Sequence, residues 1–259
     1  MSDNEKDNKE LDVQEFQCLR LLRGVYPEPG KNEILRSAQN DKRRTRNDSF
    51  KVETFLDVEN YLIYEPLLNN SNEQKSCRIK SPSSKGYLFI SQNGEELKLA
   101  LYLGRETVSN LKNIHLQKDF SSSNLSDFFL TTEEISHFIY AVWNAMNNRQ
   151  ITIFEMELQA EVDKYITAIF YSSSINSGRV PAKNIKKHLF EDSVLNPDLL
   201  SEERERYRDA NRLAMNYCHY LESNYLKRND ISSLLKDIRH FYRLGQNGKI
   251  GYINNITFH

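Results

Sequence analysis

Glycine, proline and cysteine are all scarce in this chain of 259 residues, which contains nine, six and three of them respectively. Neither glycine nor proline occurs in residues 105–177 or 198–244. Two such long stretches without helix breakers favour helices over a β-sandwich or barrel. The three cysteines are far apart and form no CxxC pair. Their number and spacing argue against a disulfide framework and against a thiolate zinc site.

Long apolar runs and an excess of one charge are missing too. No run of about 18 uncharged apolar residues is present, and the start MSDNEKDNKELD is too polar for a signal peptide. The 35 basic and 36 acidic residues leave a formal charge of −1, so no overall field attracts nucleic acid or a membrane surface. We therefore expect a cytoplasmic protein with no membrane association. The 39% share of hydrophobic residues is enough to build a buried core.

The fold class expected from these patterns is α+β, with a small antiparallel sheet in the N-terminal half and a helical bundle in the C-terminal half. Residues 1–11 are charged and poor in apolar side chains, which predicts a disordered tail. Residues 12–259 are predicted to form a single domain that opens with a helix at 12–23. Within it we expect an inserted flexible loop at 24–49, a sheet-containing part at 50–130 and a helical part at 131–259.

The inserted loop contains NEILRSAQNDKRRTRND, residues 32–48. This segment resembles the translated dispersed repeats that occur inside bacterial reading frames. A surface loop tolerates such an insertion because lengthening a flexible loop costs little free energy. Its basic residues Lys42, Arg43, Arg44 and Arg46 also support an alternative in which the protein associates with RNA. No aromatic side chain is interleaved with them, so we do not expect nucleic acid as the partner.

The segment GYLFISQNGEELKLALYLG, residues 86–104, predicts a β-hairpin. Asn93 and Gly94 suit the two central positions of a type I′ turn, which would place Leu88 opposite Leu99. Leucines alternate with polar or small residues after the turn, which predicts one buried and one solvated face of the sheet.

An isolated hairpin is only marginally stable, so a third strand is expected. We expect it from residues 51–64 or from residues 114–116. The pattern of residues 51–64 is itself ambiguous between a strand and a short helix. Residues 69–85 are predicted to be a polar loop.

The helical part is predicted from apolar side chains at helical spacing. The predicted helices span residues 131–148, 152–171, 183–191, 201–227 and 231–244. Thr131 or Thr132 is expected to cap the first of them and Ser201 the fourth. Residues 246–249, QNGK, are predicted to form a turn that leads into a hairpin.

The segment FEMELQAEVDKY, residues 154–165, is unusual because five of its residues are charged within an apolar helical pattern. On a helix that advances about 100° per residue, apolar side chains form two separate faces. Glu157, Glu161 and Lys164 lie on a narrow strip between those faces. We expect this strip to be shielded from water and Glu161 to pair with Lys164, because shielded charges must be paired.

His137 could join this strip from the preceding helix. If the two helices fold back on one another, His137 is expected at the level of Glu161 and Glu134 at the level of Lys164. A general acid/base or metal site using His137 with Glu157 and Glu161 is therefore an alternative function.

The polar pattern of the first helix argues against this arrangement. His137 lies on the same side of that helix as Glu133, Tyr140 and Asn144, which predicts a solvated stripe opposite the core. No catalytic residue, metal or cofactor is therefore predicted. His137, Glu157, Glu161 and Lys164 are kept as a candidate functional strip.

Two [DE]xxH motifs, Glu134–His137 and Asp237–His240, have the spacing that places a carboxylate and an imidazole on one helix face in di-iron bundles. About one match is expected by chance in a chain of this composition. The order of the helices also differs from that pattern, so a di-iron centre is only a weak alternative.

The favoured function is a non-enzymatic protein-binding or regulatory module. The chain lacks GxGxxG, GxxxxGK[ST], HExxH and GxSxG. Tyr217, Tyr220 and Tyr225 offer an aromatic surface to another protein or to a second copy of this chain.

SHFIYAVWNA followed by FEMELQAEVDKY is similar to a family of uncharacterised bacterial proteins. The resemblance implies a bacterial protein whose natural form lacks the segment at 30–48, and it implies no activity.

Overall fold

The computed structural model describes the sheet-containing and helical parts of the chain and none of residues 1–45. The described residues are 46–47, 52–53, 58–63, 76–80, 85–93, 96–112, 122–175, 182–191, 197 and 199–257. The predicted tail, the predicted helix at 12–23 and most of the predicted insertion therefore lie outside the described residues.

The N-terminal half contains a small mixed sheet, which confirms the α+β class. Its strand order is β3-β6-β5-β4, and the strands are β3 (Leu62–Ile63), β4 (Ser76–Lys80), β5 (Gly86–Asn93) and β6 (Glu96–Leu103). Strand β3 pairs in parallel with β6, and the other pairs are antiparallel. A separate two-stranded ladder joins β1 (Arg46–Asn47) to β2 (Val52–Glu53), and a 3₁₀ turn spans Val58–Tyr61.

The predicted hairpin is confirmed, but its predicted register is wrong. Leu88 lies opposite Leu101, and Asn93 lies opposite Glu96. The observed register joins two fully buried leucines, and it stacks the Tyr87 ring on Tyr102 at 4.5 Å. Each leucine stays on the face predicted for it, because the shift moves every pair by two positions and side chains alternate with a period of two.

Strands β3 and β4 test the predictions of a third strand and of a polar loop before the hairpin. Residues 51–64 supply the expected third strand as β3, and the same stretch holds both strand and 3₁₀ turn. The prediction of a polar loop is wrong for residues 76–80, which form the edge strand β4. Strand pairing is made by backbone groups, so a polar edge strand gives only a weak apolar signal in the sequence.

Helices account for most of the described residues after β6. They are α4 (Arg105–Lys112), α5 (Ser122–Met146), α6 (Ile153–Ile175), α7 (Ala182–Lys186), α8 (Ser201–Leu221), α9 (Ile231–Arg243) and α10 (Gln246–Thr257). Two π-helical turns, Lys187–Glu191 and Glu222–Leu226, continue α7 and α8. The helices expected at 152–171, 183–191, 201–227 and 231–244 are confirmed to within a few residues.

The predicted caps and the predicted C-terminal hairpin are wrong. Helix α5 begins at Ser122, so Thr132 lies inside it and its hydroxyl donates to the Phe128 carbonyl at 2.8 Å. The first turn of α8 is closed by Glu203, whose carboxylate accepts from the Leu200 backbone N–H at 2.9 Å. Residues 246–249 open α10 instead of a hairpin.

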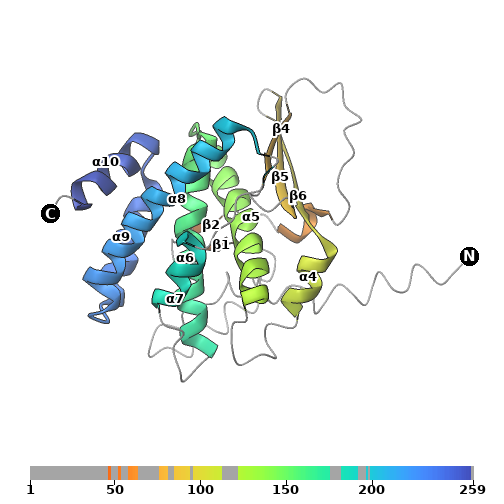
Figure 1. Cartoon of the computed structure of the whole chain (residues 1–259). Coiled ribbons are helices and arrows are strands. Elements are labelled where there is room, and N and C mark those ends of the chain that lie inside the picture. The colour runs from red at the N-terminus through yellow and green to blue at the C-terminus, as the bar shows by residue number, and fades with distance from the viewer. Residues whose placement is uncertain are drawn as a thin grey trace, which may run out of the picture.

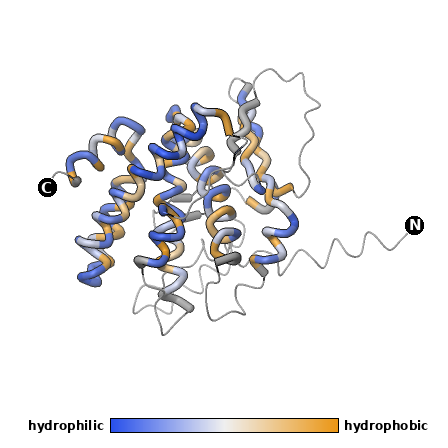
Figure 2. The backbone as a smooth tube through the Cα atoms, in the orientation of Figure 1, coloured by the Kyte–Doolittle hydropathy of each residue, from blue (hydrophilic) through white to orange (hydrophobic). Residues whose placement is uncertain are grey.

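The elements lie in successive layers, with the sheet at one side, then α5, α6 and α8, and α9 and α10 at the other side (Figure 1). Helix α5 packs against β5 and β6 and also against α6. Apolar residues recur along β5 and β6, whereas α8 is hydrophilic over much of its length (Figure 2). Among the described residues, no helix is both long enough and apolar enough to cross a membrane.

Candidate metal centre

Helices α5 and α6 fold back on one another through a tight turn. Asn148 adopts a positive φ of 52°, and the Arg149 backbone N–H donates to the Asn144 carbonyl at 2.9 Å. A residue in this left-handed conformation just past a helix is a common way to end it. The turn places the polar faces of α5 and α6 against each other.

His137 lies at the centre of this interface and is 0% exposed. Its Nε2 atom is 3.6 Å from Glu157 Oε2 on α6, and its Nδ1 atom is 3.9 Å from Glu134 Oε2 on α5. Neither ring nitrogen has a hydrogen-bond partner among the described residues. The predicted solvated histidine is therefore wrong, because the sheet covers one side of α5 and α6 covers the other.

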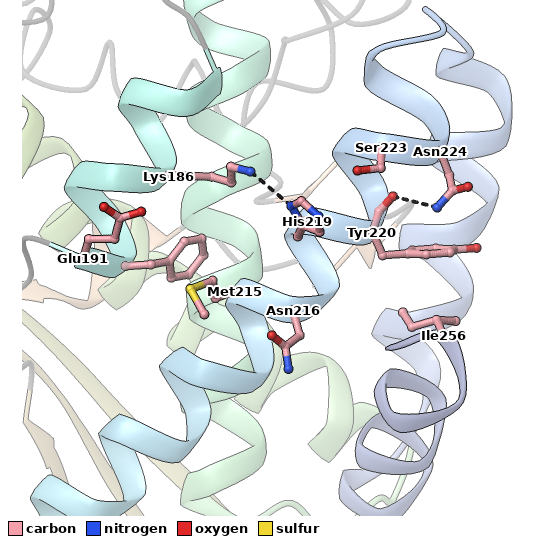
Figure 3. Close-up of a pocket in the computed structure, with 10 residues that line it drawn as sticks. Lys186, Glu191, Met215, Asn216, His219, Tyr220, Ser223, Asn224 and Ile256 are labelled. Atoms are coloured by element: carbon pink, nitrogen blue, oxygen red, sulfur yellow. Dashed lines mark hydrogen bonds between the residues drawn. The ribbon is translucent and has the colours of Figure 1, made fainter. Parts of the chain in front are cut away.

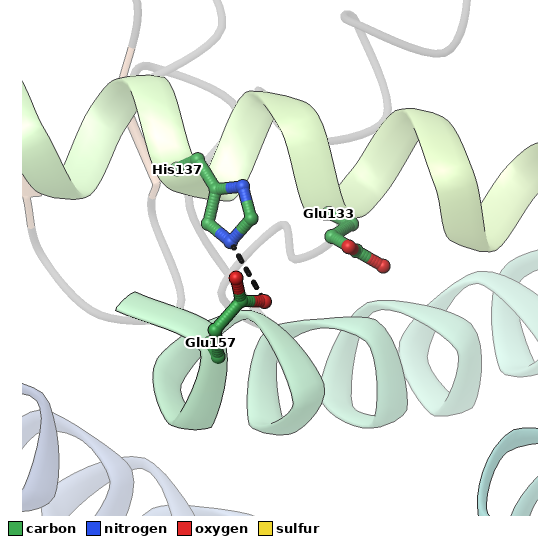
Figure 4. Close-up of side chains that lie close together, drawn as sticks. All are labelled: Glu133, His137 and Glu157. Atoms are coloured by element: carbon green, nitrogen blue, oxygen red, sulfur yellow. Dashed lines mark ion pairs between the residues drawn. The ribbon is translucent and has the colours of Figure 1, made fainter. Parts of the chain in front are cut away.

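Glu133 completes a set of three that could hold a metal ion. One donor atom from each of Glu133, His137 and Glu157 lies within 4.8 Å of the others, and all three side chains are buried (Figure 4). Glu133 and His137 share a helix face because they are four residues apart on α5. Metal–ligand bonds of about 2.0–2.2 Å place neighbouring ligand atoms about 3–4 Å apart, so the set needs little movement to surround one ion.

Lys164 holds the other end of the cluster. Its Nζ atom donates to Glu161 Oε1 and to Glu133 Oε2, both at 2.8 Å. The predicted pairing of Glu161 with Lys164 is confirmed, and Glu133 is an additional partner that the sequence did not reveal. Burial disfavours the charged lysine, but the two carboxylates outweigh it and raise the pKa of Lys164.

The predicted levels of the two helices were therefore wrong by one turn at His137 and by one residue at Lys164. His137 meets Glu157 instead of Glu161, and Lys164 meets Glu133 instead of Glu134. The four residues of the candidate strip nevertheless lie in one buried cluster, connected through Glu133.

The buried cluster contains more carboxyl groups than basic groups. The carboxyl groups of Glu133, Glu134, Glu157 and Glu161 face two basic groups, Lys164 and His137. Burial raises the pKa of Glu134 to about 8 and that of Glu161 to about 7, and it raises the pKa of Glu157 as well. Glu134 therefore holds a proton at neutral pH, and Glu161 titrates close to it.

His137 also holds a proton when no metal is present. Burial disfavours the imidazolium, but Glu134 and Glu157 outweigh it and raise the pKa of His137 to about 10. A metal ion and a proton therefore compete for the same imidazole.

The two other acidic residues of FEMELQAEVDKY are satisfied within the protein. Asp163 accepts from Ser136 Oγ at 2.5 Å and from Gln159 Nε2 at 2.8 Å. Glu155 accepts from the Tyr140 hydroxyl and, at 3.1 Å, from the Gln246 backbone N–H that begins α10. These two residues therefore serve the packing of the helices.

The polar layer continues as far as α10. Lys249 on that helix is fully buried and donates to Gln159 Oε1 at 2.5 Å and to the Phe241 carbonyl at 3.0 Å. Burial lowers the pKa of Lys249 to about 7. The predicted turn at residues 246–249 gave no indication that this lysine is buried.

Of the three tyrosines proposed as a partner surface, Tyr217 is buried, whereas Tyr220 and Tyr225 are partly exposed. Asp237 accepts hydrogen bonds from the hydroxyls of Tyr217 at 2.6 Å, Tyr225 at 2.8 Å and Tyr252 at 2.9 Å. Tyr217 is fully buried and Tyr220 is half-buried. Tyr217 is therefore a core residue and offers nothing to a partner.

The second [DE]xxH motif, Asp237–His240, does not form a buried cluster of carboxylate and imidazole groups. Its Asp237 is occupied by three tyrosine hydroxyls, whereas its His240 is exposed. Only Glu134–His137 lies in a buried cluster with unpartnered donor atoms.

A surface pocket of about 400 Å³ lies apart from the cluster (Figure 3). Both π-helical turns line it, through Phe190 and Glu191 on one side and Ser223 and Asn224 on the other. Lys186 Nζ lies 3.5 Å from His219 Nδ1 at its wall. None of the residues of the buried cluster lines this pocket.

No family model, curated protein or solved structure matches this chain. The resemblance to uncharacterised bacterial proteins therefore stays a prediction.

Glu133 is the member of the metal-binding set that was not predicted from the sequence. It lies four residues before His137 on the polar side of α5, and that side is buried as well as the apolar side. A helix that is buried all round places its polar residues against other protein groups.

Proposed function

We propose that this protein binds one divalent transition-metal ion between α5 and α6, through Glu133, His137 and Glu157. The observation that supports the proposal is that one donor atom from each of these three buried side chains lies within 4.8 Å of the others. His137 is fully buried, and its ring nitrogens face carboxylate oxygens at 3.6 and 3.9 Å without a hydrogen bond of ordinary length. Two carboxylates this close to one another repel unless a cation or a proton lies between them.

The spacing of the donor atoms favours coordination over hydrogen bonding. The 3.6 Å between His137 Nε2 and Glu157 Oε2 is longer than an ordinary hydrogen bond. When two side chains bind the same metal ion, their donor atoms lie about this far apart, because each atom contacts the ion instead of the other side chain. Glu134 on the Nδ1 side is placed to accept the remaining imidazole proton, as carboxylates behind metal-binding histidines commonly do.

The donor set indicates the class of metal. It offers one imidazole nitrogen and carboxylate oxygens, and the buried Cys218 is not one of the three residues. Imidazole with carboxylates suits Fe²⁺ or Mn²⁺, whereas thiolates select copper(I) and structural zinc. Three protein ligands leave coordination positions open, which is typical of catalytic metal sites and agrees with the metal-dependent alternative from the sequence.

Protein binding receives less support. Of the tyrosines that motivated it, Tyr217 and Tyr225 donate hydrogen bonds to Asp237, and the Tyr220 hydroxyl pairs with that of Tyr225. Most of the basic run that motivated RNA binding lies outside the described residues, so the structure adds nothing to that hypothesis.

The test is the metal content of the full chain, purified without chelator from cells supplied with manganese and iron. We expect close to one equivalent of metal per chain and a higher Tm with Mn²⁺ than after chelation, because a ligand that binds the folded state stabilises it. His137→Ala should lower the Mn²⁺ affinity by more than about 10–100-fold. That range is typical for loss of a residue that only supports a metal ligand, and loss of a ligand itself should cost more.

His240→Ala is the matched control, because His240 occupies the same motif on an exposed face of α9. It should leave the metal content unchanged. A wild-type protein that contains no metal and shows no Tm change with Mn²⁺, Fe²⁺ or Zn²⁺ would contradict the proposal.

A further inference from the structure

Lys164 occupies an unusual position beside the proposed metal ligands. Its ammonium lies 2.8 Å from a carboxylate oxygen of Glu133 and 2.8 Å from one of Glu161, and the residue is only 5% exposed. The second oxygen of each of these carboxylates has no hydrogen-bond partner among the described residues. Lys164 is thus held between two acidic side chains that come from different helices.

Glu133 connects the proposed metal ligands to the ion pair of Lys164 and Glu161. It is one of the three residues whose donor atoms converge with His137 and Glu157, and it also accepts from Lys164. In two-metal sites the ions lie about 3.5–4 Å apart, close enough for one carboxylate to contact both. Here the second position next to the shared carboxylate is filled by an ammonium group.

We propose that Lys164 acts as a built-in second cation, which limits this centre to one metal ion. The inference rests on the proposed metal binding by Glu133, His137 and Glu157. It concerns the number of ions that the same cluster accepts, and it predicts that removing Lys164 creates a second cation position between Glu133 and Glu161.

Charge balance supports this assignment. With Glu133, Glu134, Glu157 and Glu161 ionised and His137 neutral, one divalent ion and Lys164 leave a net charge of −1. Without Lys164 the net charge is −2, which a second divalent ion would bring to zero. Removing the ammonium therefore strengthens the attraction between this buried cluster and a further cation, since uncompensated charge in the interior is costly.

The volume of the Lys164 side chain also supports a second cation position in its absence. Replacing Lys164 with alanine removes the ammonium and the aliphatic chain behind it, at a site enclosed by α5 and α6. The carboxylates of Glu133 and Glu161 would then face a polar gap, and each would offer two oxygens to an incoming ion. Hard divalent cations bind such oxygen sites.

The experiment measures Mn²⁺ stoichiometry in the full chain by titration and by electron paramagnetic resonance, for wild type and Lys164→Ala. We expect one Mn²⁺ in the wild type, and two in the variant with the spectrum of a magnetically coupled pair. Lys164→Arg keeps the positive charge and should bind one ion. Lys227→Ala, at an exposed lysine after α8, is the control for loss of a surface charge.

A second readout covers the case in which Lys164→Ala does not fold without metal. Its Tm should rise with Mn²⁺ concentration at about twice the wild-type slope, because two ions would be taken up on folding. A variant that binds one ion, or that no Mn²⁺ concentration folds, would overturn the role of Lys164 and leave the proposed function intact. A wild-type protein that binds no ion would instead overturn the proposed function.

Discussion

The Lys249 ammonium lies 4.4 Å from the centre of the Phe241 ring and donates a hydrogen bond to the carbonyl of the same residue. A single aromatic residue thus contacts this buried lysine through both its ring and its backbone. Gln159 supplies the other hydrogen bond, so Lys249 fastens α10 to α9 and to α6.

The depressed pKa of Lys249 predicts a pH dependence of stability. Burial lowers this pKa from 10.5 to about 7, and Arg149 acts in the same direction, whereas Glu155 and Asp163 oppose it. Above pH 10.5 the lysine is neutral in both states. Between pH 7 and 10.5 only the unfolded state holds the proton, so stability rises with pH, and below pH 7 the full cost of burying the lysine persists.

Lys249→Met should remove this dependence. Relative to the variant, the wild type should gain about 1.4 kcal/mol in the free energy of unfolding per pH unit between pH 7 and 10, as expected for one proton. Chemical denaturation at a series of pH values measures the difference, with Lys227→Met as the exposed control. Parallel pH profiles for wild type and Lys249→Met would show that Lys249 titrates normally in the folded protein.

Gly86→Ala tests how the sheet places Glu134. A Cβ atom at this position would lie 3.0 Å from Glu134 Cγ and 3.1 Å from Leu130 Cδ1. We expect a loss of about 1–3 kcal/mol in stability because the site is already packed. We also expect Mn²⁺ affinity to fall by about tenfold, since Glu134 supports His137.

Gly251→Ala is its matched control. Nothing lies within 4 Å of a Cβ atom at that position in α10, so the alanine should stabilise the protein by about 0.5–1 kcal/mol through helix propensity alone. Equal effects of the two substitutions on Mn²⁺ affinity would argue against contact between β5 and the metal centre.

Asp237→Leu should destabilise the protein strongly. It would leave the hydroxyls of Tyr217, Tyr225 and Tyr252 without their shared acceptor, at a cost of roughly 3–5 kcal/mol. Tyr225→Phe removes one of the three donors and should cost about 1 kcal/mol. Urea denaturation distinguishes the two, and a loss below 1 kcal/mol for Asp237→Leu would mean that the tyrosines find other partners.

Glu157→Gln separates metal binding from folding. The substitution removes the negative charge that faces His137 but keeps the shape of the side chain, so the metal-free protein should lose about 1–3 kcal/mol and Mn²⁺ affinity should fall by more than tenfold. Isothermal titration with Mn²⁺ and thermal unfolding in chelator measure the two effects. Glu202→Gln, on the exposed start of α8, should change neither. Unchanged Mn²⁺ affinity in Glu157→Gln would exclude Glu157 as a ligand.

Local patterns in the sequence determined much of the architecture. The scarcity of helix breakers predicted the helices of the second half, and alternating leucines predicted the β5–β6 hairpin with the correct faces. The pairing of Glu161 with Lys164 was predictable because the two residues are three positions apart on one helix. Each of these features depends on neighbours along the chain, and periodicity reports those directly.

Only the tertiary structure decided where the polar face of α5 lies. The sequence shows that His137 is opposite an apolar stripe, but it does not show that the sheet covers that stripe while α6 covers the polar side. Glu133 meets Lys164 across 31 positions of sequence, and Lys249 meets Gln159 across 90. Such contacts depend on how helices stack and turn back, so the burial that makes the cluster a candidate metal centre follows from the packing of the layers and not from any local pattern.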